Sequence, residues 1–591
     1  MEKRVLLAVF LSFLVLVVYQ SLVPPPEERA AAPPRPTSQS AAPAAPGLQP
    51  AAPGPQPAAP GTRPAAPPPE APTTFASPLV AGEAERDIVV DTPAVRAIFS
   101  NREAVLTSWR LKRYNDATGQ PLELVPQELP QGTPSVFTLL FPDGTDSVLL
   151  PRVIFRASEA GLNVQSDTQT LGFEYRDANG LAVTKSFTFD PAQPYVVSFS
   201  VRAERSGKRL DPIIHFGAAL GPGTNASSST SYVAPARAIL LKDGDVERIG
   251  VGDLSDPEEA VHLGTFPFAG VDEHYFLSAL VRPEEQLRVE YRPVAMPAAG
   301  DRPARQYVAY SARFTAPPAN KRLFLGPKDF DVLAAADRDL VRAIDFGMFA
   351  FLVVPLLRAL TWINGWVGNY GWSIIILTVL INAVMFPLRH KSVVSMRKMQ
   401  EIQPEVKAIQ DRYAKLKMSD PARQKMNVEL MNLYRQKGAN PASGCVPMLL
   451  TFPVLIAFYS LLSVAIELRG APFAGWIKDL SQPDPLYITP ILMGATMVWQ
   501  QKLTPVTTAD PVQQKMMMFM PVMFTVFFLW APSGLVLYWF VSNLWAIGQQ
   551  LVTNRIIGPP RAHAMRPAAE RRVKRVGGGK TDQAETGGRA S

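Results

Sequence analysis

The first half of the chain alternates apolar and polar residues over short stretches. In 95–99, 185–189 and 195–201, apolar residues recur at every second position, and many are β-branched or aromatic. This period of two predicts half-buried antiparallel strands, which turn signals such as Asn179-Gly180 separate. A long series of such strands over 81–330 predicts a large all-β sandwich domain.

Long apolar runs replace this alternation in the second half. Five of them approach the length that crosses a bilayer core at about 1.5 Å per residue, so they predict the second to sixth membrane spans. These spans are 371–388, 446–466, 486–503, 514–531 and 533–553. An earlier run over 346–357 is only about 12 residues long, which is typical of an interfacial amphipathic helix and predicts one at 344–363.

The N-terminus carries its own apolar run. Lys3 and Arg4 precede apolar residues over 5–23, which are long enough to form a first span. No small-x-small site follows the run, so we predict an uncleaved signal anchor at 1–23, with a cleaved signal peptide as the alternative. Ala, Pro and Gly dominate 24–80, which therefore predicts a disordered tether.

Basic residues decide which side of the membrane each loop faces. The formal net charge is +8, and Lys and Arg concentrate after the second span and in the tail at 554–591. The positive-inside rule places both segments in the cytoplasm. Six spans satisfy this placement, with both termini inside and the β-domain on the outer face. Counting 346–357 as a span would put the basic loop outside.

The basic loop at 389–445 has its own helical pattern. Apolar residues recur at spacings of three and four, as one seam of a helix. They are Met396, Met399, Ile402, Val406, Ile409, Tyr413 and Leu416. A second helix is predicted from Asp420-Pro421 to Gly438, with Met426, Leu430 and Leu433 on its seam. The loop is therefore predicted to form a cytoplasmic helical hairpin.

The residues that would indicate an enzyme are few. Cys445 is the single cysteine, so no disulfide can form within the chain. His215, His262 and His274 lie in the β-domain without metal-ligand spacing, and no nucleophile motif accompanies them. We expect no catalytic residue, no metal and no cofactor.

Ordered motifs over about 321–555 resemble the YidC/Oxa/Alb insertase family, in its Gram-negative form with a large periplasmic domain. These motifs are 325–330 (LGPKDF), 385–388 (MFPL), 440–441 (NP), 444–447 (GCVP), 467–469 (ELR), 471–473 (APF), 490–494 (PILMG), 519–522 (FMPV) and 532–538 (PSGLVLY). Over the β-domain the resemblance is only architectural.

The resemblance implies a membrane protein insertase and chaperone of the cell inner membrane, with a periplasmic β-domain. Such a protein inserts, folds and helps to assemble integral membrane proteins, alone or with the Sec translocon, without hydrolysing ATP. It implies a polar groove open to cytoplasm and lipid. The expected partners are nascent membrane proteins, the Sec translocon, the ribosome and signal-recognition machinery, and membrane lipids.

Polar residues within the spans predict where this groove lies, because function is the default hypothesis for them. Thr378 and Asn382 share a face of the second span, and Arg389 lies two turns further on, at the groove mouth. Trp539, Asn543 and Gln500 complete the predicted substrate groove. Alternatively, such residues only hydrogen-bond neighbouring helices.

Asn382 departs from the family pattern, which has an arginine at this position. Asparagine supplies hydrogen bonds but no positive charge. Arg389 could supply charge from the mouth, though not at the same depth. The role of a groove cation is therefore an open question for this sequence.

Apolar contact with clients is assigned to four further residues. Met520 and Met523 belong to a group of methionines at the start of the fifth span, and flexible methionines suit a surface that accepts many apolar sequences. Ordinary packing is the alternative. Phe452 and Leu455, on the third span, are assigned the same role.

Two other classes of protein fit less well. A transporter or channel should carry paired charges or repeats in its spans, and none is recognised here. The basic tail at 571–575 could meet RNA electrostatically, but topology and anionic lipid explain it as well. No specific nucleic-acid site is predicted.

Overall fold

The computed structural model describes residues 77–557, apart from 117, 131, 142–149, 219, 221–223, 226–234, 298–303, 348, 414–421, 439–445 and 504–510. The signal anchor predicted at 1–23 and the tail beyond 557 lie outside the described residues. So do most of the tether and the Asp420-Pro421 helix start. The chain divides into two compact units. Of the described residues, one unit holds those up to Asp345 together with Val464–Gly470, and the other holds Phe346–Ser463 and those from Ala471.

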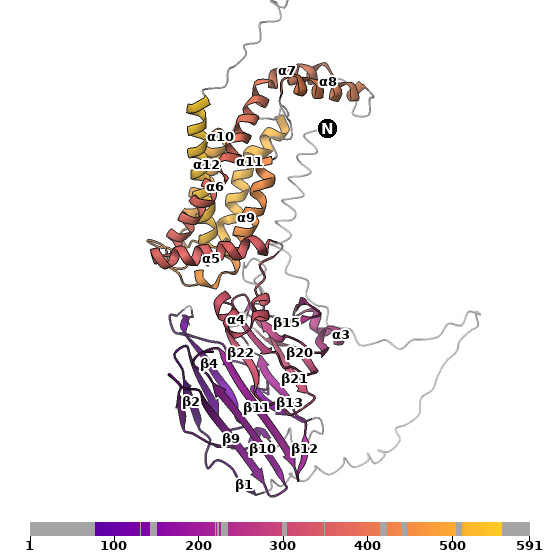
Figure 1. Cartoon of the computed structure of the whole chain (residues 1–591), viewed down its shortest axis with the longest axis vertical. Coiled ribbons are helices and arrows are strands. Elements are labelled where there is room, and N and C mark those ends of the chain that lie inside the picture. Colours follow the sequence, from indigo (N-terminus) through magenta and orange to yellow (C-terminus); the bar gives the residue numbers. More distant parts are fainter. Residues whose placement is uncertain are drawn as a thin grey trace, which may run out of the picture. The chain divides into compact units, whose positions relative to one another are not determined.

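The first unit contains two large sheets, which Figure 1 shows as long strands in indigo and magenta. The strand order of one sheet is β1 (Pro78–Val80), β9 (Gln169–Asp177), β10 (Leu181–Phe189), β11 (Val196–Arg205), β22 (Lys321–Pro327), β19 (Phe276–Val281), β18 (Phe268–Asp272), β15 (Arg237–Lys242) and β16 (Asp245–Ile249). Two short strands extend it, β12 (Lys208–Leu210) on β11 and β7 (Arg156–Ala157) on β9.

The second sheet has a similar size. Its order is β17 (Val261–Gly264), β20 (Leu287–Met296), β21 (Arg305–Phe314), β13 (Ile213–Ala218), β6 (Val136–Leu140), β4 (Val105–Asn115), β3 (Val95–Ser100), β2 (Asp87–Asp91) and β8 (Gly161–Asn163). β14 (Thr224–Asn225) pairs with β21, and β5 (Pro121–Glu123) with β4. The described pairings are antiparallel, except that β2 and β8 run parallel.

The two sheets pack face to face through aromatic side chains. Phe187 of the first sheet lies 4.7 Å, between ring centroids, from both Phe99 and Phe137 of the second. Trp109 of β4 donates from Nε1 to the carbonyl of Leu325 on β22 at 3.0 Å. The predicted β-sandwich is therefore confirmed. β1 begins at Pro78, inside the range assigned to the tether, because it pairs with β9.

Short helices complete this unit. They are η1 (Leu150–Arg152), η2 (Asp253–Ser255), α3 (Pro257–Ala260), α4 (Phe330–Ala336), η3 (Arg338–Ala343) and η5 (Ile466–Leu468). Gly326 shows why the motif before α4 needs a glycine: a Cβ there would stand 2.8 Å from the side chain of Tyr195. Asp329 then caps α4 by accepting hydrogen bonds from two backbone N–H groups.

The second unit is helical. Its elements are α5 (Ala350–Val367), α6 (Tyr370–Glu401), α7 (Gln403–Arg412), α8 (Ala422–Gln436), α9 (Val446–Val464), α10 (Ile488–Leu503), α11 (Pro511–Phe527), η6 (Phe528–Trp530) and α12 (Ser533–Ile557). By length and composition, three described helices could cross a membrane: Ala350–Val367, Tyr370–Lys391 and Ser533–Ile556. Pro453–Val464 and Met518–Trp530 are shorter apolar helices.

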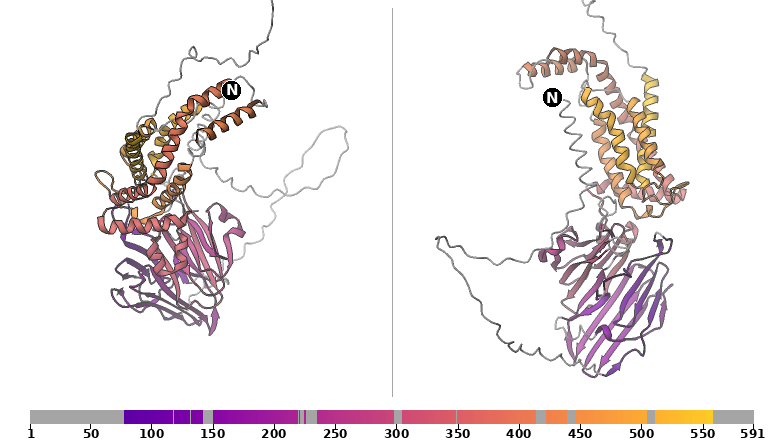
Figure 2. Two further views of the ribbon diagram at one scale, coloured as in Figure 1. Left: turned by 45° about the horizontal axis from the view of Figure 1, so that its top comes forward. Right: turned by 180° about the vertical axis from the view of Figure 1, so that it is seen from behind.

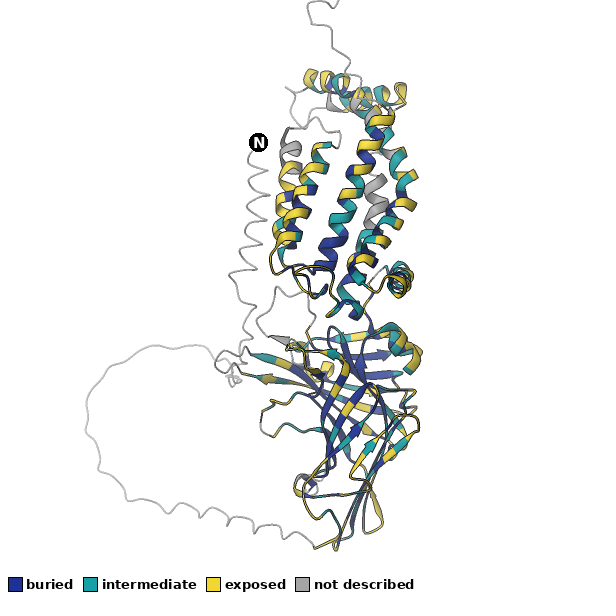
Figure 3. Cartoon of the chain, turned by 90° about the vertical axis from the view of Figure 1, so that its left-hand side faces the viewer, coloured by how far each residue is buried: buried dark blue, intermediate teal, exposed yellow. Residues whose placement is uncertain are grey.

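Two parts of this unit differ from the upright helices. Figures 1 and 2 show α5 lying across one end of the bundle and α7 with α8 at the other. α5 is longer than the apolar run that predicted it, and it exposes Phe351, Trp362 and Trp366 on one side. Figure 3 shows many positions along the upright helices in the colour of exposed residues.

The helical hairpin begins later than the sequence pattern predicted. α6 continues to Glu401, well beyond 388, and the seam from Met396 to Leu416 is broken at Ile402. Pro404 explains the break, because proline lacks an N–H and is favoured in the first turn of a helix. Beyond it, α7 and α8 pack through a core that contains Ile402 and Val406.

Candidate functional site

Three of the predicted groove residues form one hydrogen-bonded chain on α6. Thr378 Oγ1 donates to the carbonyl of Ile374 at 2.6 Å, and Asn382 Nδ2 donates to the carbonyl of Thr378 at 2.8 Å. Arg389 Nη1 then donates to Asn382 Oδ1 at 2.8 Å. The spacings of four and seven residues keep all three side chains on one face of the helix.

Arg389 brings charge to the level of Asn382. Thr378 is fully buried and Asn382 is 3% exposed, so neither amide nor hydroxyl forms an open surface by itself. Arg389 is half-buried, and its guanidinium folds back along α6 to reach the Asn382 amide. Sequence reasoning placed this charge only at the groove mouth, because residue spacing does not show where a long side chain turns.

Tyr538 of α12 lies next to this chain. Its phenol and the guanidinium of Arg389 lie within electrostatic range of each other. Its ring stacks on Phe458 of α9, with 4.3 Å between centroids and 14° between planes. Sequence reasoning missed Tyr538 and chose its neighbour Trp539.

Trp539 and Asn543 lie on another face of α12. The Trp539 ring is 5.0 Å from that of Phe528 and 5.6 Å from that of Phe524. Asn543 Nδ2 lies 3.3 Å from Thr496 Oγ1 of α10. Gln500, half-buried, follows Thr496 by one turn of α10. The predicted polar set therefore separates into a group on α6 and a contact between α10 and α12.

A third set of polar groups follows the C-terminal half of α12. Trp545 Nε1, Gln549 Nε2 and Thr553 Oγ1 are buried atoms with no hydrogen-bond partner among the described residues. Their spacing of four residues puts them on one face, seven residues on from Tyr538. Polar groups in a membrane protein need partners, so this face is suited to water or to a polar segment of another chain.

The residues assigned to apolar contact have different surroundings. Met520 is 41% exposed and Met523 40% exposed, both on α11. Leu455 of α9 is half-buried. The side chain of Phe452 lies outside the described residues.

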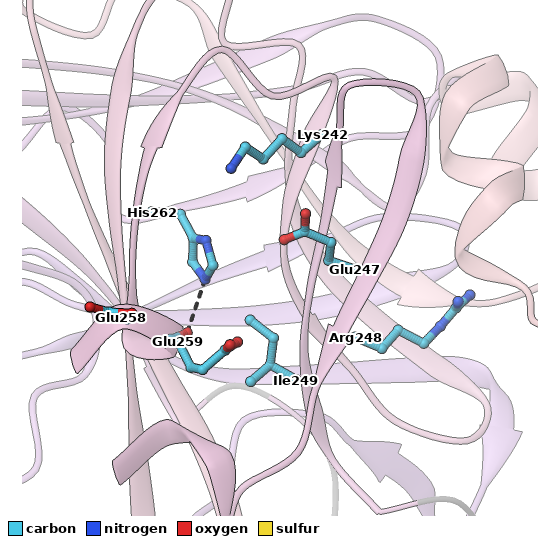
Figure 4. Close-up of a pocket in the computed structure, with 7 residues that line it drawn as sticks. All are labelled: Lys242, Glu247, Arg248, Ile249, Glu258, Glu259 and His262. Atoms are coloured by element: carbon cyan, nitrogen blue, oxygen red, sulfur yellow. Dashed lines mark hydrogen bonds between the residues drawn. The ribbon is translucent and has the colours of Figure 1, made fainter. Parts of the chain in front are cut away.

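The sandwich unit has a polar pocket of about 510 Å³ beside the edge strands β16 and β17. Figure 4 shows Lys242, Glu247 and His262 around it, with Arg248 directed away from His262. His262 Nε2 lies 2.9 Å from the carbonyl of Glu259. Both signs of charge line the pocket, so its composition does not favour an anionic or a cationic ligand.

His215, another of the three histidines considered in the sequence analysis, makes a hydrogen bond within its own strand, β13. Its Nδ1 accepts a hydrogen bond from the N–H of Gly217 at 2.9 Å, and burial lowers its pKa to about 4. His274 packs edge-on against the ring of Tyr275, with 4.2 Å between centroids. These contacts are structural ones.

Comparison with known proteins gives consistent matches over nearly the whole chain. Residues 87–359 match the family model described as YidC periplasmic domain, and residues 362–559 match that described as 60Kd inner membrane protein. A protein of Geobacter metallireducens named membrane protein insertase YidC is 36% identical over 585 residues, covering 95% of this chain and 100% of the relative. The protein of that name in Geobacter sulfurreducens is 36% identical over 576 residues, covering 95% and 100%.

A solved structure, described as an active YidC insertase crystal structure with the first transmembrane domain resolved, is also similar. It is 19% identical, covers 81% of this chain and 94% of its own, and gives a TM-score of 0.33.

Proposed function

This chain belongs to the YidC family of membrane protein insertases, and on that premise we propose that clients enter the bilayer along a polar path built on α6 and α12. The protein is an inner-membrane insertase with a periplasmic β-domain. The path begins at Arg389 and Asn382, passes Tyr538, and continues along the inner half of α12.

The hydrogen bond between Arg389 and Asn382 is the observation that carries this proposal. An asparagine alone gives an acidic client segment no cation to bind, but its amide oxygen holds the Arg389 guanidinium at the same level. The hydrogen bond uses one of the five N–H donors of the guanidinium, which leaves others for a client or for water. Arg389 thus supplies the positive charge, and Asn382 holds it at the level where the family pattern has an arginine.

The buried atoms of Trp545, Gln549 and Thr553 that have no partner among the described residues extend the path toward the inner end of α12. An extended polar segment carries free backbone N–H and C=O groups, which can satisfy such atoms in turn. The exposed Met520 and Met523 of α11 offer a flexible apolar surface for the hydrophobic part of the same client. Client contact by Leu455 and Phe452 belongs to the same proposal.

The arrangement in the membrane follows from charge, because counting α5 as a span, for which it is long enough, would put the basic α7–α8 hairpin outside. We place the first span at 1–23 and the others on α6, α9, α10, α11 and α12, with α5 lying in the interface. Both termini and the α7–α8 hairpin then face the cytoplasm, where ribosome and signal-recognition machinery can bind. The Sec translocon and lipids are the proposed partners within the membrane. Insertion of this kind needs no catalytic residue.

Charge substitutions at the pair test the proposal. Arg389→Gln should lower insertion of clients with acidic translocated tails roughly tenfold, since a hydrogen bond to a charged group contributes about 1.5–3 kcal/mol. The double variant Asn382→Arg with Arg389→Gln moves the cation to the family's usual position and should restore insertion. Lys391→Gln, which removes an exposed charge two residues on, is the matched control.

The measurement is insertion of a tail-labelled client into vesicles that contain equal amounts of each variant. Full activity of Arg389→Gln with acidic clients would contradict the role of the pair. Photo-cross-linking locates the path separately. A probe at Gln549 should capture stalled nascent chains, whereas one at Leu551, which is 42% exposed on the opposite side of α12, should capture lipid.

A further inference from the structure

The segment Ala471–Tyr487, which leads into α10, is hydrogen-bonded to the first turn of α12. Ser533 donates to the carbonyl of Gln482 from its N–H at 2.8 Å and from its Oγ at 2.7 Å. The N–H of Gly534 donates to the carbonyl of Leu480 at 2.9 Å. The segment therefore lies against the N-terminal end of α12.

The same segment also contacts the start of α6. Asn369 Nδ2 donates to the carbonyls of Pro472 and Phe473 at 3.2 and 3.0 Å. The Phe473 side chain lies so close to Gly371 that no Cβ would fit there, and its ring centroid is 5.7 Å from that of Trp372. Since α6 and α12 carry the proposed client path, the segment joins the N-terminal ends of both helices of the path.

An apolar contact separates the path from this end of the helices. Leu480 and Ile374 are fully buried, and both approach Gly534. A Cβ at Gly534 would stand 3.3 Å from the Leu480 carbonyl oxygen and 3.4 Å from Ile374 Cδ1. Thr378 and Tyr538 follow Ile374 and Gly534 by four residues each. The polar groups of the path therefore begin one helical turn beyond the apolar contact.

Asp484 ties the middle of the segment to the start of α10. It is 1% exposed, and its Oδ1 accepts hydrogen bonds from Trp476 Nε1 and from the N–H of Leu486, both at 2.9 Å. Its Oδ2 accepts from the N–H and the Oγ1 of Thr489 at 2.8 and 2.7 Å. Hydrogen bonds to a carboxylate are stronger than those between neutral groups, so this side chain fixes the segment firmly.

We propose that Asp484 is a positioning residue for insertion, which holds Ala471–Tyr487 against α6 and α12 and thereby seals the client path at that end. The inference rests on the proposed path, and the proposed arrangement in the membrane assigns the seal to the outer side. Water that reaches Thr378 from the cytoplasm then meets the contact at Leu480 before it reaches the outer side. A polar client segment can thus be accommodated without a continuous route for ions.

Thiol labelling of the full-length protein from each side of the membrane tests the seal. The probe is Thr378→Cys in a variant that lacks Cys445, because Thr378 is fully buried at the sealed end of the path. A membrane-impermeant methanethiosulfonate should label it in inverted vesicles but not in spheroplasts. Trp476→Phe removes one hydrogen bond to the Asp484 carboxylate and should raise the labelling rate in spheroplasts roughly tenfold. Asp484→Ala should raise it further, and the rate in inverted vesicles should not change in either variant.

Two substitutions serve as controls. Asp479 lies in the same segment, but its Oδ1 accepts from the N–H and the Oγ of Ser481, two residues on, at 2.8 and 2.7 Å. Asp479→Ala should therefore leave labelling in spheroplasts at the level of the unaltered segment. Thr489→Ser keeps both donors to Asp484 and should do the same, whereas Thr489→Val should label faster.

The side from which labelling increases decides between the outcomes. An unchanged rate in spheroplasts for both Asp484→Ala and Trp476→Phe would overturn the positioning role. An equal rise from both sides would mean a loosened bundle and would overturn it as well. If Asp484→Ala does not accumulate, Trp476→Phe, which keeps an aromatic ring, decides alone. Absence of labelling in inverted vesicles for every variant would refute the client path itself and, with it, this role.

Discussion

Asn543 of α12 donates a hydrogen bond to Thr496 Oγ1 of α10 at 3.3 Å, and both side chains are buried. Thr496 in turn donates to the carbonyl of Met493 in its own helix at 2.7 Å. The amide of Asn543 is thus engaged between two helices. This contact fits the alternative hypothesis that Asn543 hydrogen-bonds a neighbouring helix rather than lining the groove. Arg389 and Asn382, by contrast, both lie on α6.

Removal of this interhelical bond should therefore affect stability more than client specificity. In a double-mutant cycle of Asn543→Ala and Thr496→Val, we expect a coupling free energy of about 0.6 kcal/mol, the average for hydrogen bonds between membrane helices. Unfolding of the full chain in mild detergent measures the coupling, and insertion assays show whether acidic and neutral clients lose activity equally. A selective loss for acidic clients would return Asn543 to the client path.

The sequence predicted the sandwich and the apolar helices well because both rest on regular patterns. Alternation over 185–189 and 195–201 corresponds to β10 and β11, and the long apolar runs correspond to α6, α9 and α12. Pro404 also indicated a break between α6 and α7, but the apolar residues continue at helical spacing across it and favoured a single helix. Local chemistry overrode periodicity at that point.

The candidate site was harder to predict because α12 has polar residues on several sides. Tyr538 and Trp539 are adjacent in sequence, yet one stacks on Phe458 and the other packs near Phe528. Residue spacing assigns side chains to faces, but only tertiary packing decides what each face meets. The link from Arg389 to Asn382 likewise needed a side-chain conformation that no sequence pattern contains.

Topology has a direct test in two matched positions. Lys407 is exposed on α7 and Arg96 is exposed on β3. In a variant that lacks Cys445, Lys407→Cys should react with a membrane-impermeant thiol reagent only after the membrane is opened, because the positive-inside rule predicts that the basic hairpin lies inside. Arg96→Cys should react in spheroplasts without such opening. Reaction of Lys407→Cys in intact spheroplasts would refute the six-span arrangement.

Lys185 should stabilise the sandwich in a pH-dependent way. Its Nζ donates to the carbonyls of Glu103, Ala104 and Phe137 at 2.6, 3.1 and 2.8 Å. All three carbonyl residues have positive φ, of 62°, 50° and 73°, so the ammonium holds an unusual backbone arrangement. Lys185→Met should lower the free energy of unfolding by about 2–5 kcal/mol, because buried carbonyls lose their donor.

The sign of the pH dependence follows from burial, which lowers the pKa of Lys185 from 10.5 to about 7. Between these values the unfolded chain binds more protons than the folded one, so wild-type stability relative to Lys185→Met should rise with pH above about 7. Below pH 7 the difference in free energy of unfolding between wild type and Lys185→Met should be smallest and should not change with pH. Protection of β10 amides against hydrogen exchange measures both variants. An equal pH profile for the two would show that Lys185 does not titrate there.

The hairpin gives the last prediction, which separates its fold from its charge. Val406 is buried in the α7–α8 core, whereas Ala408, two residues on, is exposed. Val406→Asp should open the hairpin by placing a carboxylate in an apolar core, at a cost of several kcal/mol. Ala408→Asp adds the same charge at the surface and should leave the hairpin closed.

If the closed hairpin receives ribosomes or signal-recognition machinery, Val406→Asp should reduce insertion of co-translationally delivered clients while Ala408→Asp remains near wild type. Protein abundance and protease sensitivity of the membrane unit must be unchanged in both, which limits the effect to the hairpin.

The exposed ion pairs Arg412–Glu429 and Lys437–Glu405 should contribute only about 0–1 kcal/mol each to the stability of the hairpin, so the effect of Arg412→Gln should be mild. Equal loss in the two aspartate variants would mean that added negative charge, rather than loss of the packed seam, impairs delivery. The basic faces of the hairpin would then be the binding surface to test.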